Sequence, residues 1–153
     1  MNELFDSLAA VKPVDGVFAV LGNHERRYKE NALQAMEYFD IVLLADSVVA
    51  IERASDSIYL AGIYDSFVYD SLVVQPTESV NGEAFVMLLC HTPDYAERSS
   101  TTADIVFSGH THGGQVSLFG LYTPVKNTQY GKRFLRGMNK ASSGASVITT
   151  NGV

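Results

Sequence analysis

The sequence has little of what defines several large classes of protein. Its 153 residues include a single cysteine, Cys90, which excludes an intrachain disulfide framework. No apolar run approaches the roughly 20 residues that a membrane-spanning helix needs, and the chain does not open on a secretory signal peptide. It also lacks internal repeats and low-complexity segments. With 46% hydrophobic and 18% charged residues, the composition is that of one globular domain.

Acidic residues are missing from the last third of the chain. All 17 of them lie at or before Asp104. Five cations follow: Lys126, Lys132, Arg133, Arg136 and Lys140. These cations form either a solvated loop or a basic rim that attracts a phosphorylated substrate or an anionic head group. Because the net charge is −6 and no recognised binding motif is present, we expect no nucleic acid partner.

Every histidine of the chain follows a short apolar run that is predicted to be a buried strand. The four are His24, His91, His110 and His112. The runs occupy residues 17–21, 85–90 and 105–107. In open α/β sheets, ligands bind at the carboxyl ends of such strands. Two histidines at i and i+2 cannot share a helical face, but on a glycine-rich loop they can diverge toward two neighbouring metal ions. A turn with no ligand role is the alternative.

The hydrophobic pattern predicts an α/β fold. We expect strands at residues 16–21, 41–44, 48–52, 58–63, 84–90, 104–108, 116–119 and 146–150, with a long loop before the last. A helix is predicted over residues 26–39, because apolar residues recur there at helical spacing. These are Tyr28, Ala32, Ala35, Met36 and Phe39.

A second helix is predicted to begin directly after His91. Thr92 can cap free backbone N–H groups, and Pro93 suits the first helical position. Asp94 then favours the positive end of the helix. No more than a short helix is expected within residues 64–82.

Three motifs in order carry a family resemblance: GNHE at residues 22–25, the isolated His91 after a strand, and GHTHGGQ at residues 109–115. In this order the chain resembles the calcineurin-like metallophosphoesterases, over residues 8–153. GHTHGGQ points to the branch that includes bacterial membrane- or wall-associated phosphoesterases and UDP-diacylglucosamine pyrophosphatases. The resemblance implies a four-layer α/β/β/α sandwich, present here in part.

The family's first two motifs, Asp-x-His and Gly-Asp-x-x-Asp, have no match upstream of Gly22. Asp6 and Asp15 have neither a histidine partner nor a preceding glycine and apolar strand. We therefore expect residues 1–153 to be the C-terminal two-thirds of a single phosphoesterase domain, truncated at both ends. Whether Met1 is the true start, and whether the two motifs lie upstream, is left open by the sequence.

The resemblance also implies roles for individual residues. Two divalent metal ions, of Mn, Fe, Zn or Ni, are expected in the full-length domain. Asn23, His91 and His110 would bind the second ion, and His112 the first. His24 would not bind metal but would be the catalytic histidine, which stabilises the transition state or protonates the leaving oxygen. The alternative for Asn23 is a helix N-cap or turn residue.

Three further residues have alternative interpretations. Glu25 is expected to support the site through hydrogen bonding or at the helix terminus. Asp104 either orients a histidine or is an ordinary loop carboxylate. Cys90 is interpreted as a buried thiol, with a soft metal ligand as the alternative.

The implied activity is metal-dependent hydrolysis of phosphomonoesters, phosphodiesters or pyrophosphate-linked lipids by a metal-activated hydroxide. We expect weak or no activity from these 153 residues alone, because the bridging aspartate belongs to a missing motif. The alternatives are a non-catalytic scaffold with a phosphoesterase-like fold and a single-ion site. The expected partner is a phosphorylated small-molecule or lipid substrate, and the resembling branch suggests peripheral membrane association of the full-length protein. The substrate-binding residues, the localisation and the oligomeric state do not follow from the sequence.

Overall fold

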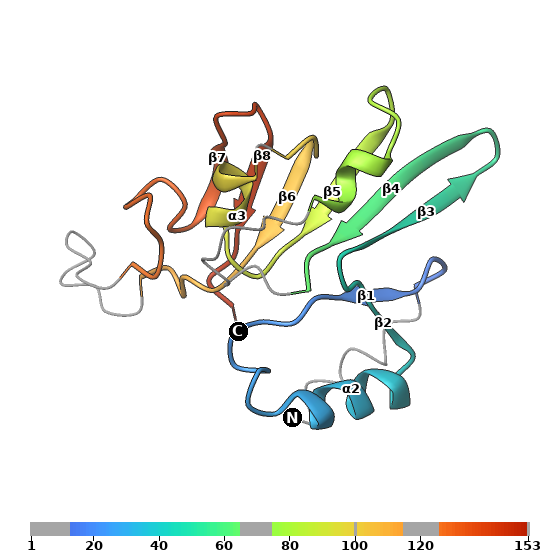
Figure 1. Ribbon diagram of the computed structural model, residues 1–153, viewed down its shortest axis with the longest axis horizontal. Coiled ribbons are helices and arrows are strands. Elements are labelled where there is room, and N and C mark those ends of the chain that lie inside the picture. The colour runs from blue at the N-terminus through green and yellow to red at the C-terminus, as the bar shows by residue number, and fades with distance from the viewer. Residues whose placement is uncertain (1–12, 65–74, 100, 115–125, 153) are drawn as a thin grey trace.

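The computed structural model describes residues 13–64, 75–99, 101–114 and 126–152. The strand predicted at residues 116–119 lies outside these ranges. Two sheets and the helices that flank them form the described part of the chain (Figure 1). A 3-10 helix, η1 (Pro76–Ser79), agrees with the expectation of no more than a short helix within residues 64–82.

The larger sheet has six strands in the order β3-β4-β5-β6-β8-β7. Their bounds are β3 (Ser47–Arg53), β4 (Asp56–Gly62), β5 (Phe85–Leu89), β6 (Ile105–Ser108), β7 (Gly137–Lys140) and β8 (Ser146–Thr149). The four central strands run parallel, and β3 and β7 pair antiparallel at the two edges. Parallel strands are covered on both faces, which explains why the central ones read as short apolar runs.

The smaller sheet is a parallel pair, β1 (Val17–Ala19) and β2 (Ile41–Leu43). Parallel neighbours need a crossover connection, and here α2 (Lys29–Tyr38) provides it. Ala32 and Met36 of this helix are buried against the small sheet. This unit forms the core on the N-terminal side of the described chain.

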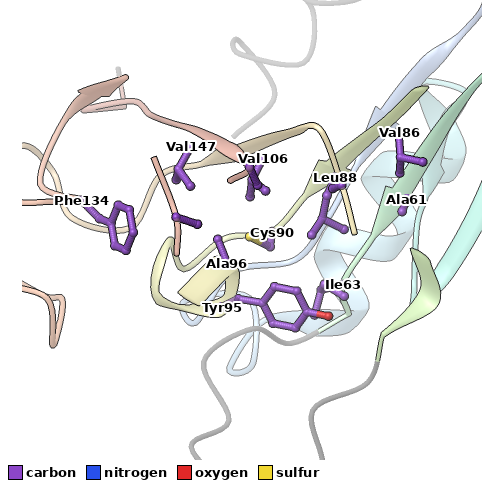
Figure 2. Close-up of a cluster of buried hydrophobic side chains, with 13 residues drawn as sticks. Ala61, Ile63, Val86, Leu88, Cys90, Tyr95, Ala96, Val106, Phe134 and Val147 are labelled. Carbon is purple, nitrogen blue, oxygen red and sulfur yellow. The ribbon is translucent and has the colours of Figure 1, made fainter. Parts of the chain in front are cut away.

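The register of the large sheet shows which side each layer occupies. Ala61, Leu88, Val106 and Val147 are successive cross-strand partners, so they share one face, and all four are fully buried. Helix α3 (Asp94–Arg98) packs on that face through Tyr95 and Ala96 (Figure 2).

The opposite face of the large sheet meets the small sheet. A Cβ atom added to Gly62, the neighbour of Ala61, would point to that side. It would lie 2.2 Å from Cβ of Leu44 and 3.0 Å from Cγ1 of Val20. The layers therefore follow the order α2, small sheet, large sheet, α3 (Figure 1). The α/β fold with the expected helix–sheet–sheet–helix layering is confirmed.

Three local predictions were wrong. Helix α2 begins at Lys29 rather than residue 26, because Arg27 and Tyr28 donate backbone hydrogen bonds that close tight turns first. Tyr28 consequently lies outside the buried stripe and is 55% exposed. At α3, Pro93 occupies the N-cap position, and no side chain makes a capping hydrogen bond.

The third error was the expected long loop before β8, because β7 lies within it. Its sequence, Gly-Met-Asn-Lys, carries no apolar alternation, and Met138 is 71% exposed. This edge strand is formed by its pairing with β8 alone. In the described ranges, none of the helices combines the length and apolarity required to cross a bilayer.

Candidate metal centre

The carboxyl edge of the large sheet brings two of the predicted ligands together. Strands β5 and β6 are parallel neighbours, so the residues that follow them leave the sheet side by side. The backbone N–H of Gly109 donates to the carbonyl oxygen of His91 at 3.0 Å, which extends the strand pairing beyond both strands. His91 and His110 thereby come into contact, with ring centroids 4.9 Å apart.

The third predicted ligand, Asn23, reaches the same point from the small sheet. Its Oδ1 lies 2.7 Å from Nε2 of His91 and 3.1 Å from Nδ1 of His110. The two imidazole nitrogens are themselves 3.1 Å apart. Three polar atoms from residues far apart in the sequence thus form a small triangle.

The triangle cannot be explained by hydrogen bonds alone. A neutral imidazole carries one N–H, and an amide oxygen carries none. Whichever tautomers the two rings adopt, at most two of the three contacts can hold a hydrogen. A cation could accept one lone pair from each of the three atoms at once. Metal bonds of about 2.1 Å at the right angles of octahedral coordination place neighbouring donors about 3 Å apart, close to the two 3.1 Å sides of the triangle.

Both histidines of the triangle favour the neutral form. The pKa of His91 is lowered from 6.5 to about 4, mainly by burial and then by the charges of His110, His24 and His112, whereas Glu25 acts in the opposite direction. Burial likewise lowers the pKa of His110. A neutral imidazole has a ring-nitrogen lone pair with which it can bind a metal.

His24 and His112 stand beside the triangle but outside it. Both side chains are exposed, and their charges still act on the pKa values of His91 and His110. His112 faces a second stretch of chain, because a Cβ atom on Gly152 would lie 4.0 Å from its Nδ1. The two histidines therefore lie close enough to the triangle to take part in chemistry at the site.

The loop that carries His110 and His112 has unusual backbone dihedrals. Both histidines have positive φ, 66° and 50°, and Gly113 follows at 63°. Non-glycine residues rarely adopt this region, and they persist there only where their surroundings hold them. One anchor is the buried Thr111, whose hydroxyl donates to the carbonyl oxygen of Leu135 at 2.7 Å.

The GNHE loop is held close to His91. Gly22 lies so near the His91 ring that a Cβ atom would be 2.8 Å from its Cε1 and Nδ1. The Gly22 N–H donates to Oε2 of Glu25 at 2.8 Å. Glu25 therefore makes a hydrogen bond within the GNHE loop, of the kind expected of a residue that supports the candidate site.

Asp104 and Cys90 have no contact with the triangle. Asp104 accepts a hydrogen bond from the backbone N–H of Val86 at 2.8 Å, at the opposite end of the sheet from His91. Of its two interpretations, the one in which it orients a histidine was wrong. Cys90 is buried and free, and it contacts Ser108. Burial raises the pKa of its thiol to about 12, so the thiol stays protonated, as expected of a buried core residue.

Sequence reasoning missed the role of Asp94. This carboxylate is 1% exposed and accepts hydrogen bonds from the Thr128 hydroxyl and from the Gln129 N–H, the latter at 2.8 Å. Its charge raises the pKa of His110, opposing the effect of burial. Asp94 therefore joins the start of α3 to the segment at residues 126–131. Because Asp94 stands at the start of a helix, the sequence predicted only an interaction with the helix dipole for it.

Two of the five cations that follow Asp104 (Arg133 and Lys140) have structural roles. Arg133 forms an ion pair with Glu97 at 3.0 Å and donates to the carbonyl oxygen of Lys140. The ammonium group of Lys140 donates to the Gly144 carbonyl oxygen and the Ser146 hydroxyl. These two cations stabilise the region around β7.

The residues present fit a divalent cation. Two neutral imidazoles and one amide oxygen form a mixed N and O donor set that several transition metals accept. Within the described ranges no group of three His, Cys, Asp or Glu side chains forms a metal cluster, because the third donor here is an asparagine.

The chain belongs to the calcineurin-like phosphoesterase family, whose model matches residues 1–114. This family of phosphoester hydrolases generally uses divalent metals. An uncharacterized metallophosphoesterase of Aquifex aeolicus is 30% identical, and the match covers 100% of this chain and 59% of the relative.

Two other relatives show the same relation in length. An uncharacterized metallophosphoesterase of Helicobacter pylori is 28% identical, over 93% of this chain and 38% of the relative. The phosphodiesterase YaeI of Escherichia coli is 28% identical, over 99% of this chain and 55% of its own length. The chain thus spans about four to six tenths of these curated relatives. No solved structure matches it.

Proposed function

We propose that this chain forms part of a metal-dependent phosphoesterase in which Asn23, His91 and His110 hold one divalent ion. The observation that carries the proposal is the triangle of Asn23 Oδ1, His91 Nε2 and His110 Nδ1, which a cation explains better than hydrogen bonds do. His112, on the same loop, is proposed to bind a second ion. The substrate would be a phosphorylated small molecule or lipid, cleaved at a phosphomonoester, phosphodiester or pyrophosphate bond.

Bound divalent ions would neutralise phosphate oxygens and make a water molecule more acidic. The chain's own residues supply the remaining functions. His24 is exposed beside the triangle and would donate a proton to the leaving oxygen or stabilise charge in the transition state. Glu25 accepts a hydrogen bond from the Gly22 N–H and so holds the GNHE loop, which carries Asn23 and His24.

A second candidate is a site for one ion only. Two observations support a single-ion site. Three protein donors meet at one point, and catalytic zinc sites usually have three protein ligands and one open position. Metal stoichiometry distinguishes the two candidates.

The first test measures metal binding rather than turnover, so that it does not depend on activity. Asn23→Ala should lower the affinity for Mn²⁺ or Zn²⁺, measured by calorimetry, by more than the roughly 10–100-fold loss typical of residues that only support ligands. Asn31→Ala, at an exposed asparagine on α2, is the matched control and should bind as wild type. Equal affinity in Asn23→Ala and wild type would refute the proposed ligand set.

The second test separates catalysis from binding. His24→Ala should keep its metal and lose about 10²–10⁴-fold in turnover of p-nitrophenyl phosphate or bis-p-nitrophenyl phosphate. It should be measured on this chain and on a form extended upstream. A chain that binds metal but hydrolyses neither ester in either form would instead support the non-catalytic scaffold.

A further inference from the structure

Strand β8 ends at the same edge of the large sheet as β5 and β6, the strands that precede the histidines of the proposed metal site (Figure 1). It runs parallel to β6, and Thr149 pairs with Ser108. The backbone N–H of Thr150 donates to the carbonyl oxygen of Ser108 at 2.8 Å, which continues the pairing one residue past β8. The chain after Thr150 therefore leaves the sheet beside the loop that carries His110 and His112.

Asn151, the first residue beyond this pairing, packs against the same loop. A Cβ atom added to Gly113 would lie 2.7 Å from Oδ1, 2.9 Å from Cγ and 3.1 Å from Nδ2 of Asn151. The amide group thus occupies the place where a side chain at position 113 would begin. Gly113 also has a φ of 63°, which residues other than glycine rarely adopt. The glycine that follows His112 therefore lets the Asn151 amide approach the backbone of the loop.

The next residue, Gly152, lies close to the His112 ring. A Cβ atom added to Gly152 would be 4.0 Å from Nδ1 of this histidine. Asn151 is therefore held at His112 in two ways, because its side chain contacts the residue after the histidine and its own neighbour in the chain faces the ring. The Asn151 amide consequently lies next to the residue that is proposed to bind a second ion.

The hydrogen-bonding capacity of this amide is available to a ligand. Asn151 is exposed, and among the described residues its amide group has no hydrogen-bond partner. An asparagine amide carries two N–H donors and one acceptor oxygen. A group bound at the neighbouring histidines can therefore accept a hydrogen bond from Asn151 without displacing a contact within the described fold.

The charge on this side of the candidate site suits an anion. No acidic residue follows Asp104 in the sequence, so the segments after β6 and β8 carry no carboxylate. A neutral amide can donate to a phosphate oxygen, and hydrogen bonds to a charged acceptor are about twice as strong as those between neutral groups. A carboxylate at position 151 would instead repel the anion.

We propose that Asn151 is a substrate-binding residue whose amide N–H donates to a phosphate oxygen of the ester bound at the metal site. This inference rests on the proposed function, since it places the phosphate beside ions held by Asn23, His91, His110 and His112. Because Asn151 contacts the substrate and not the metal, its loss weakens the binding of the phosphate group and leaves the metal affinity unchanged.

The test uses two probes, both measured by calorimetry: Zn²⁺ binding to the metal-free protein, and methylphosphonate binding to the Zn²⁺-saturated protein. Asn151→Ala should bind Zn²⁺ as wild type does and bind methylphosphonate about 10–100-fold more weakly, because a hydrogen bond to a charged group is lost. Asn151→Asp, which keeps the shape of the side chain, should weaken methylphosphonate binding further, because the carboxylate repels the anion. Asn31→Ala, at the exposed asparagine on α2, is the control and should leave both affinities unchanged.

The outcomes separate this inference from the function on which it rests. Equal methylphosphonate affinity in Asn151→Ala and wild type would overturn the role of Asn151 and leave the proposed metal site standing. A loss of Zn²⁺ affinity in Asn151→Ala that Asn151→Asp restores would also overturn it, because the residue would then be a metal ligand. Failure of wild type to bind Zn²⁺, or to bind methylphosphonate once saturated with Zn²⁺, would contradict the proposed function and this inference with it. Thermal unfolding shows that each variant is folded, and if Asn151→Ala does not fold, Asn151→Asp decides the question.

Discussion

Gly22→Ala tests how closely the GNHE loop must approach His91. The new Cβ atom would lie 2.8 Å from both Cε1 and Nδ1 of the His91 ring and 2.9 Å from Oε2 of Glu25. Ordinary van der Waals contact begins at 3.4 Å, so the ring or the loop must move by about half an ångström. The φ angle of Gly22 is not in the left-handed region, so alanine adds steric overlap without backbone strain.

The expected cost has two parts. Overpacking of this kind destabilises a protein by about 1–3 kcal/mol, which lowers the melting temperature of a domain of this size by roughly 3–10 °C. The larger effect should be on metal binding, because disturbing the groups that orient a metal ligand typically costs about 10–100-fold in metal affinity. Displacing His91 opens the triangle that it forms with Asn23 and His110. Metal affinity should therefore fall by one to two orders of magnitude.

The assay is calorimetric titration with Zn²⁺ or Mn²⁺, combined with thermal unfolding in the absence of metal. Gly82→Ala provides a matched control, because its new methyl group would meet no atom within 4 Å and the φ of Gly82 is also not left-handed. That control should match wild type in both measurements. If Gly22→Ala bound metal as tightly as Gly82→Ala, the contact between the loop and His91 would have no role in forming the site.

Three other predictions address the sheets, the thiol and the pH dependence. Gly62→Ala places a Cβ atom 2.2 Å from Leu44 Cβ, so it should force the two sheets apart. Both the melting temperature and the metal affinity should fall. Unchanged metal affinity would mean that the spacing of the sheets does not control the site. Cys90, buried with its pKa raised to about 12, should resist a thiol-specific disulfide reagent until guanidinium unfolds the protein, and rapid labelling of the native state would contradict its burial. Because the folded-state pKa of His91 is about 4 and its ordinary value is 6.5, the unfolded state binds more protons between these values. The metal-free protein should therefore lose stability as the pH falls from 6.5 toward 4, and His91→Gln should reduce this dependence in thermal scans.

The strands and the first helix could be predicted because their physical causes are local. Short apolar runs bounded by turns predict central strands, and those before His91 and His110 lie within a residue or two of their expected bounds. Strand β7 could not be predicted in this way. Its residues are mostly exposed, and only its pairing with β8, brought close by the fold, makes it a strand.

The sequence predicted which residues meet at the candidate site, but not the contacts that hold them there. Histidines at strand ends indicate where ligands meet, whichever residues hold those ligands in place. Asp94 was interpreted by its helix-start position, yet its carboxylate binds a segment more than thirty residues away. Thr111 likewise bonds to Leu135. Such contacts depend on tertiary packing, and no periodicity or local motif indicates them.

The convergence of Asn23 with His91 and His110 depends on both sheets at once. The two histidines follow neighbouring strands of the large sheet, so their contact is fixed by the pairing of β5 and β6. Asn23 follows β1 of the small sheet and can reach them only if the sheets pack closely. That approach requires a residue without a side chain at Gly62. The distance between the layers thus sets the geometry of the site, and the packing of the two sheets acts directly on the ligand set proposed for the metal.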